Sequence, residues 1–253
     1  MGNMRAKANN RLGEINYNKF GNKMEIIEYR DCKDIDIYFH KYNWVTKNKT
    51  YRDFKKGNVS CPYEPRLFNV GYMGVDKYDS KKNNDAYVKW NSMLARCYDP
   101  KYIQKNPTYE GCEVCKEWHD FQNFTKWYYE NYYKIDEEVM CLDKDILVKR
   151  NKVYSPETCV FVPNRINVLF VKSDSKRGNL PIGVAEYKYG YRAYVSYNRK
   201  QLKLGTFNTP HEAFLMYKLN KELVIQGIAN EYKNKIPTKL YEALINYEVE
   251  EGD

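Results

Sequence analysis

Two stretches near the start of the chain, residues 24–29 and 34–39, alternate apolar and polar side chains with a period of two. That period is typical of strands with one buried face, so we predict two strands separated by a polar turn. Trp44, Val45 and Tyr51 indicate further short strands. Because basic residues outnumber acidic ones before residue 70, we expect a small basic β module that either binds nucleic acid or only supports the next module.

The apolar spacing changes to three and four residues at Ala86, which predicts a helix through Cys97. The same spacing from Trp118 to Tyr128 predicts a second helix. Large rings that recur on one helix face are typical of a hydrophobic core. We therefore expect these aromatic residues to pack together rather than to stack on nucleobases.

A strand, a loop, a second strand and a helix follow along the chain. Residues 142–146 alternate apolar and charged side chains, which predicts a strand with the carboxylates of Asp143 and Asp145 on one face. After a polar loop, residues 159–162 predict a second strand, and Pro163 is suited to the first turn of a helix. This order is the outline of a ββα unit.

Three more strands are predicted beyond a polar linker at residues 172–178, joined by turns at 188–190 and 198–200. Alternation in the middle strand places Arg192, Tyr194 and Ser196 on one face. The opposite face carries the residues expected to pack on a helix, namely Tyr191, Ala193, Val195 and Tyr197. The three strands are residues 182–187, 191–197 and 201–207.

Thr209 and Glu212 have the spacing of a capping box, with Pro210 at the first helical position between them. We expect a helix from there to Val224 or beyond, then a further helix around residues 240–247, and then a solvated acidic segment with Glu248, Glu250, Glu251 and Asp253. The predicted fold is α+β. Its three modules are a small β module at residues 1–70, a central ββα-metal-like module at 71–172, and a three-stranded sheet with helices at 173–253.

Composition narrows the expected partners and location. The formal net charge of +9 favours a polyanionic partner such as nucleic acid. No apolar run is long enough to span a membrane and the first residues lack the pattern of a signal peptide, so we expect an intracellular, cytoplasmic protein. The seven cysteines are an odd number, which favours reduced thiols.

The central module resembles a divergent branch of the HNH-type endonucleases of phages and mobile elements, over roughly residues 86–170. The resemblance implies a ββα nuclease unit that cleaves or nicks DNA with a divalent metal ion. The matching positions are Trp90, Arg96-Cys97, Val114-Cys115, Glu117-Trp118, Phe121, Phe124, Leu142-Asp143-Lys144-Asp145 and Tyr154-Ser155-Pro156-Glu157-Thr158-Cys159.

The resemblance places Asp143 where the activating histidine of this family stands and Thr158 where the branch usually has asparagine. It implies Asp143 and Asp145 as catalytic residues and as ligands of Mg or Mn, with His119 as the candidate for the missing imidazole. An unperturbed carboxylate is a poorer base than imidazole near neutral pH. Activity would therefore require a shifted pKa or a borrowed group.

Simpler interpretations of these residues stay open. Asp143 and Asp145 can equally form a solvated strand face paired with nearby basic residues, and His119 can face solvent. The cysteine spacing allows a structural zinc site, although we favour buried thiols because only one pair has the close spacing of a zinc knuckle. The four cysteines are Cys112, Cys115, Cys141 and Cys159.

The third module resembles the Apetala-type DNA-binding domains through Gly183-Val184, Arg192-Ala193-Tyr194-Val195, Leu204-Gly205-Thr206-Phe207 and Glu212-Ala213. Such domains lay a three-stranded sheet in the DNA major groove. The same two modules occur in this order in homing-endonuclease-like phage proteins. The candidate DNA-binding residues are Tyr187, Lys188, Arg192, Tyr194, Ser196, Arg199, Lys200 and Lys203.

These observations predict a protein that binds double-stranded DNA. One hypothesis is a metal-dependent endonuclease built around Asp143 and Asp145. The other is a nuclease-inactive phage protein in an infected bacterial cell, either a regulator or an anti-defence inhibitor that binds a host nucleoprotein such as a CRISPR-like complex. The missing histidine favours the second hypothesis, and the retained acidic residues favour the first.

Overall fold

The computed structural model describes residues 11–171, 179–197 and 200–253. It combines helices with several small sheets, so the predicted α+β class is confirmed. The chain forms two compact units. The first comprises the described residues up to Lys105 together with Lys116–Lys126, and the second comprises Asn106–Cys115 and the described residues from Trp127 to Asp253. The division into three modules stays a prediction.

The first unit contains a four-stranded antiparallel sheet in the order β1-β2-β3-β4. Its strands alternate as predicted, and Met24, Ile26, Ile35, Ile37 and Phe39 are fully buried on one side. The strands are β1 (Ile15–Tyr17), β2 (Lys23–Asp31), β3 (Asp34–Phe39) and β4 (Trp44–Lys49).

The prediction of a strand at Tyr51 was wrong, because a short helix, α1 (Tyr51–Lys55), begins there. The Thr50 hydroxyl accepts a hydrogen bond from the Asp53 amide at 3.0 Å, which caps the first turn. A side-chain cap satisfies an amide that otherwise has no partner in the helix, and it therefore favours the helix over an extended chain.

The predicted aromatic core is also present in the first unit. Trp90, Trp118, Phe121 and Phe124 are buried, and the rings of Trp90 and Phe121 lie 5.3 Å apart. The helix predicted through Trp118 begins only at Phe121, because Trp118 lies in a preceding 3-10 turn. The elements are α2 (Asn84–Tyr98), α3 (Pro100–Lys105), η3 (Lys116–His119) and α4 (Phe121–Asn131), the last of which continues into the second unit.

The second unit contains the predicted order of strand, loop, strand and helix. Strand β6 (Met140–Asp143) pairs antiparallel with β8 (Val160–Pro163), and the chain continues into α5 (Asn164–Asn167). Within the loop between them, β7 (Val153–Tyr154) pairs in parallel with β5 (Glu113–Val114). The first strand is shorter than predicted, since it ends at Asp143 and not at Ile146.

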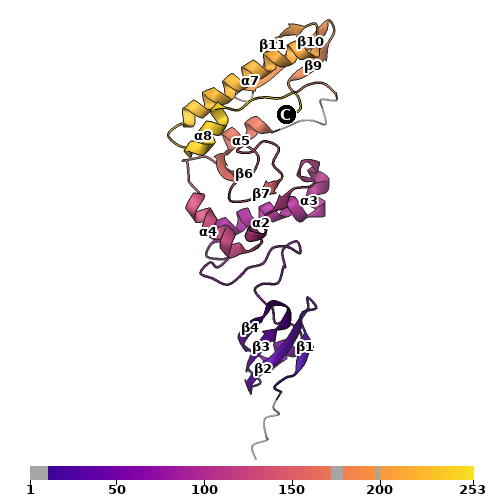
Figure 1. Cartoon of the computed structure of the whole chain (residues 1–253), viewed down its shortest axis with the longest axis vertical. Helices are drawn as coiled ribbons and strands as arrows, with labels where there is room; N and C mark the ends of the chain where they lie inside the picture. Colours follow the sequence, from indigo (N-terminus) through magenta and orange to yellow (C-terminus); the bar gives the residue numbers. More distant parts are fainter. Residues whose placement is uncertain (1–10, 172–178, 198–199) are drawn as a thin grey trace, which may run out of the picture. The chain divides into compact units, whose positions relative to one another are not determined.

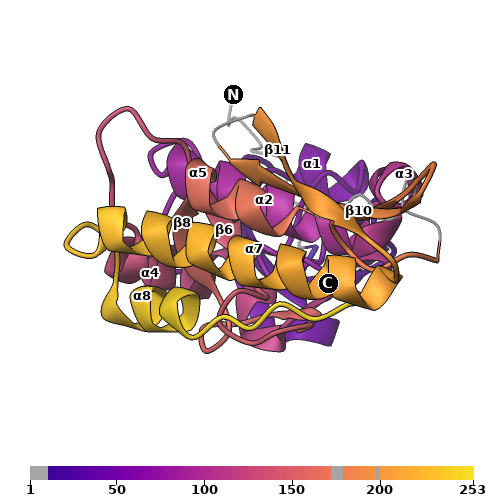
Figure 2. The same ribbon diagram turned by 90° about the horizontal axis from the view of Figure 1, so that it is seen from above.

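The three-stranded sheet of the second unit has the order β11-β10-β9, and α7 lies along it (Figure 1). The predicted capping box at Thr209 and Glu212 is confirmed. In Figure 2, α8 lies beside α7.

The predicted turn at 198–200 lies partly outside the described residues, since 198 and 199 are not among them. The elements are β9 (Val184–Tyr187), β10 (Gly190–Tyr197), β11 (Lys200–Phe207), α7 (Pro210–Tyr232) and α8 (Thr238–Ile245).

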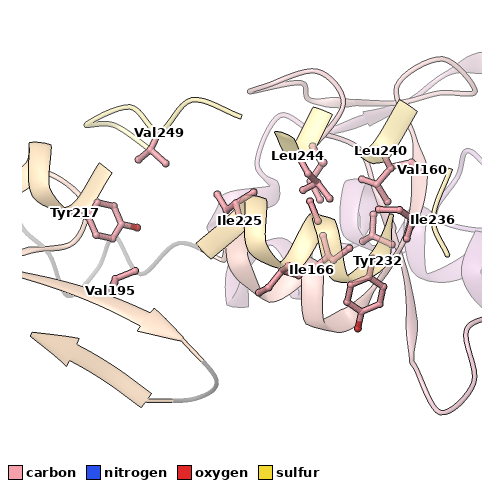
Figure 3. Packing of buried hydrophobic residues seen from close by; sticks show 14 of the residues in the cluster. Val160, Ile166, Val195, Tyr217, Ile225, Tyr232, Ile236, Leu240, Leu244 and Val249 are labelled. Carbon is pink, nitrogen blue, oxygen red and sulfur yellow. The ribbon is translucent and has the colours of Figure 1, made fainter. Parts of the chain in front are cut away.

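One hydrophobic core joins the ββα part of the second unit to its three-stranded sheet. Ile166 of α5 is fully buried with Ile225 of α7 and Leu244 of α8, and the same cluster extends to Val195 of β10 (Figure 3). A shared core makes the two parts depend on each other for stability. The sheet is therefore held by the ββα part as well as by its own helix.

The expectation of a solvated acidic segment holds for Glu248, Glu250 and Glu251, which are exposed, but not for Asp253. Val249 and Asp253 are only 3% and 6% exposed, respectively, and Val249 belongs to the core of the second unit. Glu250 and Asp253 form ion pairs with Lys149, which lies about a hundred residues earlier. A pattern of local polarity does not reveal such a distant basic partner.

Candidate functional site

The Asp143 carboxylate ends strand β6 and shapes the turn that follows. Its Oδ1 accepts hydrogen bonds from the backbone amides of Asp145 at 2.9 Å and Ile146 at 2.8 Å. An aspartate that binds amides two and three residues ahead favours a turn over a continued strand. Asp143 and Asp145 therefore do not share a strand face as predicted, because Asp145 lies in the turn beyond β6.

Burial raises the pKa of Asp143 to about 6, and the negative charge of Asp145 acts in the same direction. The two amide hydrogen bonds and the charge of Lys144 oppose this rise. A carboxylate with such a pKa is partly protonated just below neutral pH. The catalytic role of Asp143 stays a prediction.

Lys144 is paired with the second carboxylate of the turn. Its ammonium lies 3.0 Å from Asp145 Oδ2, and its side chain is only 10% exposed. Burial opposes the charge of Lys144, but the charge and hydrogen bond of Asp145 raise the pKa of Lys144 above its ordinary value. Asp145 thus serves as the counter-ion of a buried lysine, a role that the sequence pattern did not separate from metal binding.

The turn does not fit a preformed divalent-metal site. One oxygen of Asp143 is engaged by two amides and one oxygen of Asp145 by an ammonium. Among the residues that the structure describes, no group of three or more His, Cys, Asp or Glu side chains is arranged to hold a metal ion. We therefore derive no catalytic step through Mg or Mn.

His119 belongs to the first unit, at the end of the 3-10 turn before α4. Its backbone carbonyl accepts a hydrogen bond from the Tyr72 amide at 2.9 Å. The imidazole ring lies edge-on to the Tyr98 ring, with 6.4 Å between the two ring centroids. The imidazole is half-buried. Its catalytic role stays a prediction.

The four cysteines considered for zinc are reduced thiols of the second unit. Cys112 and Cys159 are buried, and burial raises the pKa of the Cys159 thiol to about 12 and that of Cys112 in the same direction. Cys115 and Cys141 are half-buried, and Cys141 Sγ lies 3.7 Å from Asn164 Oδ1. A zinc site at these four cysteines stays a prediction that we do not favour.

Three of the candidate DNA-binding residues, Arg192, Tyr194 and Ser196, lie on the face of the three-stranded sheet that points away from α7. Strand register places Arg192 opposite Thr206, Tyr194 opposite Lys203 and Ser196 opposite Gln201. Directly opposed residues share a face of an antiparallel sheet. The other face carries Ala193 and Val195, which are buried, so the predicted sidedness of β10 is confirmed.

Arg192 is held in place on this outward face. Its guanidinium carbon lies 3.3 Å from the centroid of the Tyr187 ring. A hydrogen bond with Tyr194, and another with Tyr187, raise the pKa of Arg192 against the opposing effect of burial. Stacking on Tyr187 restricts the arginine without neutralising it, so the side chain is presented as an ordered cation.

The outward face has no opposing charge among its described residues. Glu186 is the only carboxylate in the described parts of β9, β10 and β11, and its pairing with Tyr191 places it on the helix side of the sheet. Lys188 lies in the turn after β9, and Lys200 begins β11 opposite Tyr197, on the helix side of the sheet. Arg199, also predicted to bind DNA, lies outside the described residues.

Sequence reasoning missed three residues of this surface. Tyr189 is 72% exposed at the turn between β9 and β10, with the Lys188 ammonium 5.1 Å from its ring centroid. Gln201 and Thr206 join the face through the register of β11, which shifts at a bulge next to Ala193. The alternation of side chains along one strand does not reveal a β-bulge in the strand that pairs with it.

A scan against protein-family models and searches of curated proteins and solved structures found no match to the chain. The resemblances to HNH-type and Apetala-type proteins therefore stay predictions that rest on the quoted residues. No helix in the described part of the chain is long and apolar enough to cross a bilayer.

Proposed function

We propose that the protein binds double-stranded DNA through the outward face of β9, β10 and β11. The observation that carries the proposal is the guanidinium of Arg192, fixed over Tyr187 on a face without a carboxylate among its described residues. Arginine donates two parallel hydrogen bonds to O6 and N7 of guanine in the major groove. An arginine that is already ordered loses less conformational entropy on binding.

Lysines around Arg192 are placed to bind the phosphates of a DNA duplex. Lys203 on β11 lies opposite Tyr194, and Lys188 lies in the turn after β9. Lysine ammonium groups bind phosphates, and this binding supplies most of the sequence-independent affinity. The net charge of +9 acts in the same direction by attracting a polyanion.

A binding titration tests this proposal. Fluorescence anisotropy of a labelled duplex pool with a randomised centre would be measured with the unaltered chain, with Arg192→Ala and with Lys239→Ala. Lys239 is an exposed lysine of α8, so its loss removes the same charge from a different surface. We expect Arg192→Ala to weaken binding roughly 5- to 150-fold, which corresponds to one lost base contact of about 1–3 kcal/mol, and Lys239→Ala to change it little. Equal effects of the two variants would overturn the proposal.

The pKa of Asp143 supports a second candidate function, hydrolysis of DNA at the turn after β6. A half-buried carboxylate with a pKa of about 6 can accept a proton from water near neutral pH. Nicking of supercoiled DNA, with and without added Mg²⁺ or Mn²⁺, would be compared between the unaltered chain and Asp143→Asn. Nicking no faster than that of the variant would exclude this function and leave the proposal of DNA binding intact.

A further inference from the structure

Residues 248–253, here called the acidic segment, are anchored to α7 of the second unit. Val249 points into the core (Figure 3), its amide donates to Glu222 Oε1 at 2.8 Å, and its carbonyl accepts from Lys218 Nζ at 2.9 Å. Lys218 and Glu222 also pair with each other at 2.8 Å. These contacts fix the backbone of the segment, so its carboxylates are held in a defined place.

The carboxylates of the acidic segment meet two basic residues of the loop after β6, Lys149 and Arg150, here called the basic pair. The Lys149 ammonium lies 2.8 Å from Asp253 Oδ2, 3.1 Å from Glu250 Oε1 and 2.7 Å from the backbone oxygen of Glu248. Arg150 donates to the other oxygen of Glu250. Several oxygens gathered around two cations reproduce the way in which a phosphate group is bound.

Two features indicate that the basic pair is built for an anion. Arg150 adopts a φ of 63°, a left-handed conformation that favours glycine or asparagine over arginine. The side chain is 63% exposed, so burial of apolar surface does not explain an arginine at this position. Backbone strain that persists without a packing reason is typical of functional positions.

The basic pair lies beside the turn that carries Asp143 and Asp145. Lys149 is also near the Tyr247 ring, at 5.0 Å from its centroid. Asn151, the residue after Arg150, donates a hydrogen bond from Nδ2 to the backbone oxygen of Lys144 at 2.6 Å, which ties the basic pair to that turn. An anion bound at the basic pair would therefore lie next to the candidate catalytic turn.

We propose that Lys149 and Arg150 bind a backbone phosphate of DNA, and that the Glu250 carboxylate occupies this site until DNA displaces it. The inference rests on the proposed binding of DNA and adds a second contact and its regulation. Ion pairs at a protein surface contribute little net stability and are screened by salt, so a polyanion can compete with them. The side chain of Glu250 is 48% exposed and can leave the pair without opening the core.

The experiment compares Glu250→Gln with Glu248→Gln in the full chain. Both substitutions remove one negative charge, but the carboxylate of Glu248 is exposed and makes no contact with the basic pair. Affinity for a labelled duplex would be measured at several salt concentrations. We expect Glu250→Gln to bind roughly two- to fivefold more tightly than Glu248→Gln, and its salt dependence to correspond to about one additional phosphate contact.

Further substitutions test whether the gain in DNA affinity of Glu250→Gln depends on the basic pair. In a background that carries both Lys149→Ala and Arg150→Ala, Glu250→Gln should no longer raise affinity, because both cations that pair with Glu250 are missing. Thermal unfolding would confirm that each variant is folded. Equal affinities of Glu250→Gln and Glu248→Gln would overturn this inference alone, provided that Arg192→Ala still weakens binding. Duplex binding that is absent from the unaltered chain and from all variants would overturn both this inference and the proposed function.

Discussion

Replacing Asp143 by asparagine should stabilise the protein at neutral pH. The rise of its pKa from 3.8 to about 6 means that the folded chain holds this proton more tightly than the unfolded chain. Stability from this group is therefore fully present below about pH 4 and is lost as the pH rises through 6. At about 1.4 kcal/mol for each tenfold change in proton affinity, the carboxylate lowers the free energy of unfolding at pH 7 by about 3 kcal/mol.

Urea unfolding at pH 4, 5, 6 and 7, followed by circular dichroism, measures this effect. Asparagine keeps an oxygen that can accept the amides of Asp145 and Ile146 but carries no charge. We expect Asp143→Asn to match the unaltered chain at pH 4 and to exceed it by up to about 3 kcal/mol at pH 7. Asp145→Asn removes the negative charge that raises the pKa of Asp143. The loss of stability with rising pH should therefore occur at a lower pH in this variant.

Asp36 provides a control of opposite sign. Its hydrogen bond with Arg30 holds the pKa of Asp36 below the ordinary value, so its carboxylate stabilises the fold above the unfolded pKa, and this stability is lost as the pH falls. Asp36→Asn should therefore destabilise the protein at pH 7. If Asp143→Asn were the less stable protein at pH 7 and equally stable at pH 4, the ionised carboxylate would be favourable in the fold and the reasoning would be refuted.

Three further substitutions test the framework of the second unit. Gly183→Ala would place a Cβ 2.1 Å from a carbon of the Tyr217 ring at a φ of +77°, and a loss of about 3 kcal/mol is expected in thermal unfolding. Thr209→Ala removes the capping box of α7 and should cost about 1 kcal/mol in urea unfolding, whereas Thr209→Ser should cost less. Leu244→Ala leaves a cavity in the shared core and should cost roughly 2–5 kcal/mol in the same assay.

The sequence predicted elements whose signals are local. Apart from β1, which was not predicted, the strands of the two larger sheets follow from alternation, and the cap of α7 follows from the spacing of Thr209 and Glu212. The end of β6 was missed because one side chain, Asp143, diverts two backbone amides from the strand. The alternation of apolar and polar residues does not indicate that a side chain will bind these amides in place of a neighbouring strand.

In the candidate sites too, features that depend on a single strand were predicted, and features that depend on contacts between distant residues were not. The sidedness of β10 is a property of one strand, so Arg192 and Tyr194 were placed on the outward face correctly. The stacking of Arg192 on Tyr187 depends on how two strands pair. The contact of the acidic segment with Lys149 joins residues about a hundred positions apart, and only the folded chain brings them together.

Photo-crosslinking to DNA tests the central claim most directly. Duplex DNA that carries 5-iododeoxyuridine would be irradiated with the protein, and the crosslinked residues identified by mass spectrometry. The outward face of the sheet presents three tyrosines as crosslinking partners, Tyr187, Tyr189 and Tyr194. We predict crosslinks to at least one of them, and their loss with an excess of unlabelled duplex. Crosslinks confined to the sheet formed by β1 to β4, with none in β9, β10 or the turn between them, would contradict the account.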